Sequence, residues 1–180
     1  MKKSNQRGRR VVLHEGRYIR FVKEGGWEFV ERSNCTGIVI IVAKTDDDRV
    51  IFVEQYRPPV RKKVIEFPAG LVSDEHGLKG ESLESAAIRE LFEETGYRAK
   101  RMKKFLTGPV SGGSTSDLVT MVRAYGLKKT GKGGGDSTEN ITVHEVPLSN
   151  VERWLKQKEK KGYLLEPKIF AGLYFLKNGA

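Results

Sequence analysis

Short stretches rich in apolar and aromatic residues, separated by turn-forming residues, occupy the first third of the chain. Glu24-Gly25-Gly26 interrupts the early stretches, and Thr45-Asp46-Asp47-Asp48 interrupts a later pair rich in Val and Ile. Gly and Asp favour turns, whereas Val and Ile favour strands. The pattern predicts an antiparallel N-terminal meander followed by a hairpin with one buried strand. The predicted strands are Val11–Leu13, Arg17–Lys23, Trp27–Arg32, Gly37–Lys44, Arg49–Gln55 and Val64–Phe67.

The spacing of apolar residues becomes helical between Ser82 and Gly96. Ser82 or Glu81 can cap the start of this helix, and Gly96 can end it. We therefore expect a helix with one apolar and one largely polar face. The apolar face holds Leu83, Ala87, Ile88 and Leu91, and the other face holds Ala86, Arg89, Glu90, Glu93 and Glu94.

The rest of the chain contains more predicted strands than helices. The strands are not separated by regular crossover helices, which argues against a doubly wound sheet and for an α+β sandwich of mixed sheets. The predicted strands are Lys103–Thr107, Asp117–Tyr125 and Asn140–Val146, and the predicted helices are Asn150–Lys161 and Pro167–Lys177.

Composition narrows the class of protein. A chain of 180 residues suits one domain, and 33 Lys and Arg against 23 Asp and Glu give a net charge of +10. Such a surface attracts polyanions or phosphorylated metabolites.

Cys35 is the only cysteine, and no apolar segment follows the basic N-terminus, so we expect a cytoplasmic protein without a membrane partner. The basic runs at residues 2–10, 100–104 and 156–161 are interpreted as solvated faces, and we do not expect a nucleic acid as partner.

Three carboxylates crowd the predicted helix. Glu90 and Glu94 are four positions apart and share a face, with Glu93 beside them. Carboxylate oxygens suit Mg²⁺ or Mn²⁺, which could bridge the helix to the phosphates of a substrate. Arg89 can pair with Glu93 and hold it in place. A solvated acidic face is the alternative interpretation of an E-x-x-E-E pattern taken alone.

The wider sequence favours the metal site. The pattern Glu81-x7-Arg89-Glu90-Leu91-x-Glu93-Glu94-x-Gly96-Tyr97 resembles the Nudix box, G-x5-E-x7-R-E-U-x-E-E-x-G-U, in which U is apolar. Every specified position from Glu81 onward matches. The one departure is the box glycine, Gly70, which ten residues instead of five separate from Glu81. We interpret residues 73–80 as a lengthened loop, which costs little closure entropy.

Residues outside the box resemble the Nudix branch that splits ADP-ribose and other nucleoside diphosphate sugars. The similarity rests on Glu54-Gln55-Tyr56-Arg57-Pro58-Pro59 and on Ile65-Glu66-Phe67-Pro68-Ala69-Gly70. It implies a Nudix-type α/β/α sandwich of mixed sheets with an N-terminal antiparallel β-meander. It also implies two or three Mg²⁺ ions, or Mn²⁺ in their place. The implied metal ligands are Glu90, Glu93, Glu94, Glu139 and the backbone carbonyl of Ala69, and the implied substrate contacts are Trp27, Glu28, Arg32, Arg57 and Glu66.

The resemblance further implies how the chain is divided and how it works. Members of this branch commonly form homodimers by exchanging N-terminal strands, so residues 1–36 are expected to serve dimerisation and base binding, and residues 37–180 to form the hydrolase domain. Arg89 and Glu93 are expected to assist catalysis with Glu139, the implied general base or closing metal ligand. Asp136 is the other carboxylate available for that role, and glycines in residues 128–138 would let the loop swing.

The implied activity is Mg²⁺-dependent hydrolysis of the pyrophosphate bond of ADP-ribose or a related nucleotide sugar, which gives a nucleoside monophosphate and a sugar phosphate. Two alternatives stay open. The positive charge suits a pyrophosphohydrolase that acts on RNA 5′ ends, and a non-catalytic Nudix module could bind RNA. The intact box glutamates argue against the non-catalytic module, because a binder does not need three metal ligands.

Overall fold

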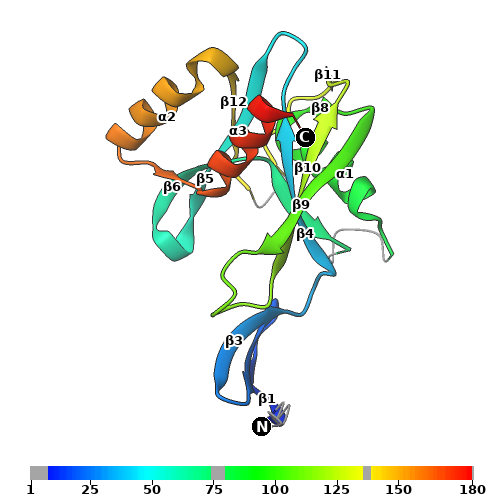
Figure 1. The fold of residues 1–180 in the computed structure, drawn as a ribbon, viewed down its shortest axis with the longest axis vertical. Coiled ribbons are helices and arrows are strands. Elements are labelled where there is room, and N and C mark those ends of the chain that lie inside the picture. Colours follow the sequence, from blue (N-terminus) through cyan, green and yellow to red (C-terminus); the bar gives the residue numbers. More distant parts are fainter. Residues whose placement is uncertain (1–7, 74–79, 136–138, 180) are drawn as a thin grey trace.

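Three α-helices and four sheets make up the part of the chain that the computed structural model describes, which is residues 8–73, 80–135 and 139–179 (Figure 1). The antiparallel N-terminal sheet, β1-β2-β3, contains β1 (Arg10–Glu15), β2 (Ile19–Glu24) and β3 (Trp27–Arg32). The central sheet, β7-β4-β10-β9, contains β4 (Gly37–Ala43), β7 (Ala69–Val72), β9 (Arg101–Pro109) and β10 (Leu118–Tyr125). The second central sheet, β12-β5-β6-β13, contains β5 (Arg49–Arg57), β6 (Lys62–Glu66), β12 (Thr142–Pro147) and β13 (Leu164–Leu165).

Both central sheets are mixed. β10 runs parallel to β4 and antiparallel to β9, and β13 runs parallel to β6 while β5 pairs antiparallel with β6 and β12. The expected sandwich of mixed sheets with an N-terminal meander is thus confirmed. A two-stranded sheet of β8 (Tyr97–Arg98) and β11 (Lys128–Lys129) completes the set.

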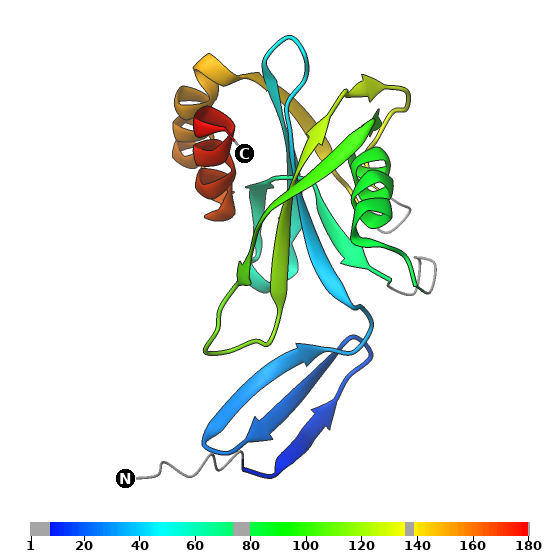
Figure 2. The ribbon, with the colours of Figure 1, turned by 45° about the vertical axis from the view of Figure 1, so that its right-hand side comes forward.

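Helices cover both sides of the sheets (Figure 2). Along β4, Ile40 and Val42 belong to the apolar cluster that contains Leu155 and Leu173 of the C-terminal helices, whereas Ile41 belongs to the cluster beneath the first helix. β4 is therefore buried on both faces, which explains why its sequence is a continuous apolar run. The helices are α1 (Leu83–Thr95), α2 (Val151–Lys160) and α3 (Lys168–Asn178).

The predicted ends of α1 are confirmed. Ser82 is the N-cap, and its hydroxyl accepts a hydrogen bond from the backbone N–H of Ser85 at 3.1 Å. Gly96 ends the helix in the left-handed conformation, with φ of 74°. The predicted polar face is wrong at two positions, because Ala86 and Glu94 are only 0% and 3% exposed. β7 packs against this side of the helix and excludes water from it.

Several short strands were not predicted from the sequence. β7, β8, β11 and β13 contain two to four residues each, too few for a period to be recognised. β9 is also longer than predicted, because pairing with β10 continues to Pro109. The bounds of the two C-terminal helices each differ by one residue from the predicted ones. None of the described helices is long and apolar enough to cross a lipid bilayer.

The N-terminal sheet projects beyond the sandwich at the end opposite to the chain's C-terminus (Figures 1 and 2). The loop between β9 and β10 holds it, since Val30 N–H donates to the Ser114 carbonyl at 3.0 Å and Ser116 N–H donates to the Val30 carbonyl at 3.1 Å. On the edge strand β1, Val11, Val12 and Leu13 are 41–48% exposed. A substantial apolar surface of this sheet is therefore open to solvent within one chain.

Candidate functional site

Arg89 organises the carboxylates of α1. Its guanidinium donates two hydrogen bonds to Glu81, from Nε to Oε1 and from Nη2 to Oε2, both at 3.0 Å. Nη1 donates to Glu90 at 2.9 Å and to Glu93 at 3.1 Å, and Nη2 also reaches the Leu71 carbonyl at 3.2 Å. The two-pronged hydrogen bond with Arg89 lowers the pKa of Glu81 and raises that of Arg89 itself. One side chain thus fixes three glutamates and joins α1 to β7.

Glu94 is the buried carboxylate of the site. Its Oε2 accepts a hydrogen bond from the backbone N–H of Ala69 at 3.1 Å, and the residue is 3% exposed. Burial raises the pKa of Glu94 well above its usual value, and the charges of Glu139 and Glu90 raise it further. The Ala69 N–H and the charge of Arg57 act in the opposite direction. Four of the sequence-predicted residues therefore act electrostatically on one buried carboxyl group.

Gly70 leaves the space that Glu90 occupies. A Cβ atom at position 70 would lie 1.9 Å from Glu90 Cδ and 2.1 Å from its Oε1. No side chain fits at that distance, so the carboxylate of Glu90 can lie against β7 only because residue 70 is glycine. The box glycine predicted from sequence is therefore in contact with the box, despite the longer segment between Gly70 and Glu81. Most of that segment, residues 74–79, lies outside the described residues.

The glycine-rich segment before β12 is fixed on the C-terminal end of α1. Gly134 N–H donates to the Glu94 carbonyl at 2.8 Å, and Gly135 N–H donates to the Glu93 carbonyl at 3.1 Å. A Cβ at position 133 would lie 2.5 Å from the Thr95 carbonyl carbon. In this part of the chain the glycines let the backbone of the segment approach α1 closely. From the sequence, the same glycines were expected to let the loop swing. The hydrogen bonds satisfy carbonyls that a helix end leaves unpaired.

Glu139 lies at the end of this segment, where its charge acts on Glu94. A Cβ at Gly135 would be 2.6 Å from Glu139 Oε2, so the glutamate lies over that glycine. The position agrees with the expectation of a carboxylate beside the box. Asp136, the alternative candidate, lies outside the described residues.

Arg57 and Glu66 form a pair on neighbouring strands. Arg57 Nε, on β5, donates to Glu66 Oε2, on β6, at 2.8 Å. The positive charge of Arg57 also acts to lower the pKa of Glu94, against the larger effect of burial. Glu66, the partner of Arg57, and Ala69, the partner of Glu94, lie in one short segment that leads from β6 into β7.

The three predicted residues of β3 lie elsewhere. Trp27 is 63% exposed and lines a cavity of about 510 Å³ between the N-terminal sheet and Gly112-Gly113. Arg32 forms an ion pair with Asp117 at 3.4 Å, and Glu28 forms one with Lys23 at 3.3 Å. No residue of α1 or β7 lines the Trp27 cavity. Within one chain, these residues are not joined to the carboxylate site.

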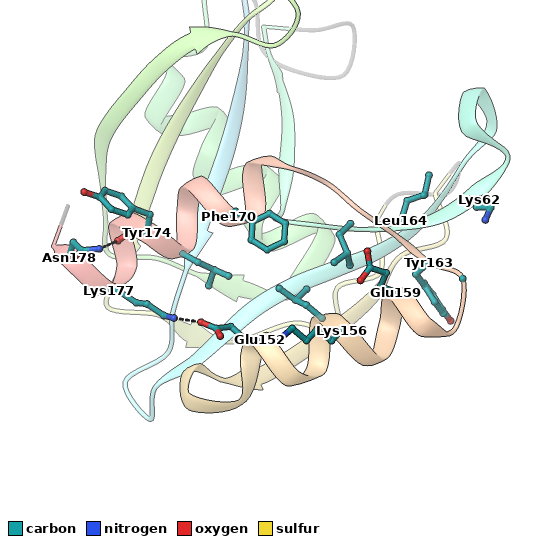
Figure 3. A pocket seen from close by; sticks show the side chains of 14 residues that line it. Lys62, Glu152, Lys156, Glu159, Tyr163, Leu164, Phe170, Tyr174, Lys177 and Asn178 are labelled. Atoms are coloured by element: carbon teal, nitrogen blue, oxygen red, sulfur yellow. Dashed lines mark hydrogen bonds and ion pairs between the residues drawn. The ribbon is translucent and has the colours of Figure 1, made fainter.

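A larger cavity, of about 860 Å³, separates α2 from α3 (Figure 3). Leu155 and Leu173 lie along it, and the Glu152–Lys177 ion pair closes one side (Figure 3). None of the sequence-predicted site residues lines it. The size of a cavity alone therefore does not identify the candidate functional site of this protein.

Two contributors to the site were missed from the sequence. Glu81 was recognised as a box position, but its role as the bidentate partner of Arg89 was not. Glu81 precedes the N-cap Ser82 and lies outside the helix, so helical spacing gave no signal for this pairing. The docking of residues 131–135 on α1 gave no signal, since it depends on tertiary hydrogen bonds.

The donor set fits a divalent cation. Among the described residues, no group of three or more His, Cys, Asp or Glu side chains is already arranged to hold a metal ion. Burial is the largest cause of the raised pKa of Glu94, and repulsion from the negative charges of Glu139 and Glu90 adds to it. A cation among them would relieve that repulsion, and hard oxygen donors favour Mg²⁺ or Mn²⁺.

Comparison with known proteins agrees with this geometry. A family model described as the NUDIX domain matches residues 35–165. The chain is 35% identical over 124 residues to the ADP-ribose pyrophosphatase of Bacillus subtilis, an alignment that covers 68% of this chain and 64% of that protein. It is 30% identical over 161 residues to the ADP-ribose pyrophosphatase of Saccharomyces cerevisiae, which covers 82% and 68%.

A solved structure of an ADP compounds hydrolase has the same fold, with a TM-score of 0.70, 21% identity and coverage of 94% of this chain and 90% of that one. The chain spans less than two thirds of the length of the Bacillus subtilis relative. The family model covers well over half of the chain, from the start of the sandwich through β13. The box, the buried glutamate and the matching family model together establish that the chain belongs to the Nudix family.

Proposed function

We propose that the protein hydrolyses the pyrophosphate bond of ADP-ribose or another nucleoside diphosphate sugar, giving a nucleoside monophosphate and a sugar phosphate. The observation that carries the proposal is the short segment between β6 and β7, where Glu66 accepts a hydrogen bond from Arg57 and the Ala69 N–H donates one to the buried Glu94. This arrangement supports a role for Arg57 as the cation that binds a diphosphate and for the nearby carboxylates as metal ligands. The named activities of the Bacillus subtilis and Saccharomyces cerevisiae relatives support the same reaction.

The residues that would hold two or three Mg²⁺ ions, or Mn²⁺, are Glu90, Glu93, Glu94, Glu139 and the carbonyl of Ala69. When bound, such ions neutralise the diphosphate and acidify an attacking water. Arg89 keeps Glu90 and Glu93 in fixed rotamers, because it donates a hydrogen bond to each of them. The Ala69 N–H does the same for Glu94.

Arg57 and Glu139 have separate roles in the proposed reaction. Arg57 would bind the diphosphate, and its pairing with Glu66 fixes the direction of the guanidinium. Glu139 would accept the proton of the attacking water, or close the metal site. Its position over Gly135, which is hydrogen-bonded to α1, supports a fixed carboxylate in preference to one carried by a swinging loop.

We propose that the complete substrate site forms in a homodimer. Trp27, with Glu28 and Arg32, would bind the nucleobase and phosphates in the site of the other subunit, since the structure keeps them apart from their own carboxylates. The exposed apolar side chains of β1 support a second chain as their cover. Residues 1–36 would then serve dimerisation and base binding, and residues 37–180 catalysis. With Cys35 as the single cysteine, we infer a cytoplasmic location.

A side-by-side assay tests this function. ADP-ribose, several nucleotide sugars and a 5′-triphosphorylated RNA are each incubated with the protein, with Mg²⁺ and with EDTA. The proposal predicts Mg²⁺-dependent release of nucleoside monophosphate from a nucleotide sugar. Turnover of the RNA alone would favour the 5′-end pyrophosphohydrolase that the net charge of +10 suggested, and no turnover of any substrate would favour a non-catalytic module.

A further inference from the structure

Two arginines pack against one tyrosine ring at the edge of the central sheet, and a lysine lies on the neighbouring strand position. Arg101 on β9 is the register partner of Tyr125 on β10, and Lys103 is the partner of Arg123. The Cζ atom of Arg101 lies 4.5 Å from the centroid of the Tyr125 ring, and that of Arg123 lies 5.2 Å from it. We call Arg101, Lys103 and Arg123, with Tyr125 between the two arginines, the cationic cluster.

The cationic cluster faces away from the Nudix carboxylates. Met102 and Ala124 alternate with its residues along β9 and β10, and both are buried in the core beneath α1. Successive side chains of a strand point to opposite faces of the sheet. The cluster therefore lies on the face opposite α1, so a ligand bound there would not be the substrate in the hydrolase site.

The charges of the cluster have no counter-charge in the described structure. Neither Arg101, Lys103 nor Arg123 forms an ion pair with any described carboxylate. The Nε of Arg123 is shielded from solvent and has no hydrogen-bond partner among these residues. Like charges held together repel, and a bound anion removes that repulsion. Elsewhere on the described surface, most arginines are paired with carboxylates, as Arg10, Arg49 and Arg57 are.

We propose that the cationic cluster binds a chain of phosphate groups, such as linear polyphosphate. Guanidinium groups donate hydrogen bonds in a planar fork that matches phosphate oxygens, and a lysine adds a point charge beside them. The tyrosine ring already packs against two guanidinium groups, so it offers less of a platform for a nucleobase than an uncovered ring. Charge, and not base identity, is therefore expected to decide binding. This site does not depend on the proposed hydrolysis.

The test measures binding of inorganic polyphosphate by calorimetry at low salt, with EDTA present so that the hydrolase site holds no divalent cation. The variant Arg101→Gln/Lys103→Gln removes two exposed charges of the cluster. The control Lys160→Gln/Lys161→Gln removes two exposed charges at the C-terminal end of α2. The cluster variant is expected to bind about tenfold more weakly and to lose roughly 1.4 from the slope of log affinity against log salt, whereas the control stays within about twofold of wild type.

An equal loss in both double variants would overturn the proposal, because net charge alone would then explain the binding. A second arm uses a single-stranded RNA of matched charge. Weaker binding of polyphosphate by the cluster variant supports the site, whether or not RNA binding also weakens. The RNA result then shows whether the site binds polyphosphate only or other phosphate chains as well. If the cluster variant binds polyphosphate and RNA as tightly as the wild type does, the proposed site is contradicted. Thermal unfolding checks the fold, and Arg101→Gln alone is the milder variant. ADP-ribose turnover is expected to be unchanged, so failure here is separate from failure of the proposed function.

Discussion

The backbone N–H of Ala69 donates a hydrogen bond to Oε2 of Glu94 across 3.1 Å. This contact joins the segment before the box to the last turn of α1, and it gives a buried carboxylate a partner. Burial of a carboxylate is costly unless its lone pairs are satisfied. The relationship explains how a residue predicted to lie on the largely polar face of the helix is buried instead. It also makes the position of Glu94 depend on the backbone of β7.

Gly70→Ala tests the contact between β7 and Glu90. The added Cβ would lie 1.9 Å from Glu90 Cδ, so the carboxylate must move. We expect kcat/KM for ADP-ribose to fall by about 10²-fold, the size of effect that a displacement of roughly 1 Å produces in an active site. Gly108→Ala is the matched control, because its Cβ would meet nothing within 4 Å. Equal activity of both variants would contradict a role for Glu90.

Glu139→Gln tests the proposed proton acceptor. Glutamine keeps the size of the side chain but cannot take a proton, so kcat should fall by roughly 10² to 10⁴ while KM changes little. Steady-state kinetics with ADP-ribose measure both constants. Asp136→Asn is the comparison variant. If Asp136→Asn abolishes turnover and Glu139→Gln retains it, the role belongs to Asp136.

Mixing two impaired variants, assayed at low ADP-ribose concentration, tests whether each site contains residues from both subunits. Trp27→Ala should mainly raise KM, by an amount equivalent to about 1 to 3 kcal/mol of base stacking. Glu94→Gln should lower kcat. In a heterodimer of the two, one site would receive both defects and the other would be intact. Recovered activity after the variants are unfolded and refolded together is therefore expected. No recovery, from heterodimers confirmed by mass spectrometry, would place each Trp27 in its own subunit's site.

A buried ion network predicts a pH effect on stability. Glu54, 5% exposed, accepts hydrogen bonds from Lys158 at 2.8 Å and Lys63 at 2.8 Å, and lies 2.9 Å from His144 Nε2. Burial alone would raise the pKa of Glu54, but the hydrogen bonds from these three residues outweigh it and lower that pKa from 4.5 to about 2. The network therefore stabilises the folded protein above pH 4.5 and loses that contribution as pH falls towards 2.

Denaturant titrations across that interval measure this effect. The unfolding free energy of the wild type should decrease between pH 4.5 and about 2, because the unfolded chain binds the proton first. Glu54→Gln should reduce this slope, and Glu159→Gln, which removes an exposed carboxylate of α2, should leave it unchanged. Identical slopes for the wild type and Glu54→Gln would show that the network contributes nothing.

The sequence predicted features that local chemistry decides and missed those that depend on tertiary contacts. α1 was predicted with both ends because Ser82 and Gly96 carry their own capping signals. β7 was missed, since four residues after a proline show no period. The burial of Glu94 could not be foreseen, because it depends on a backbone donor 25 residues away. Motif spacing proposed candidate site residues, but only the fold shows that Trp27 and its β3 neighbours lie apart from the carboxylates within one chain.

ADP-ribose hydrolysis by wild type and Glu94→Gln, measured together in Mg²⁺, tests the central claim most directly. Glutamine preserves the oxygen that accepts from Ala69 N–H, so the thermal unfolding midpoint should be retained. Loss of the carboxylate charge removes a metal ligand, so nucleoside monophosphate release should fall by at least about 10²-fold. A folded Glu94→Gln protein that turns over ADP-ribose at the wild-type rate would contradict the assignment of the Nudix carboxylates as the catalytic centre.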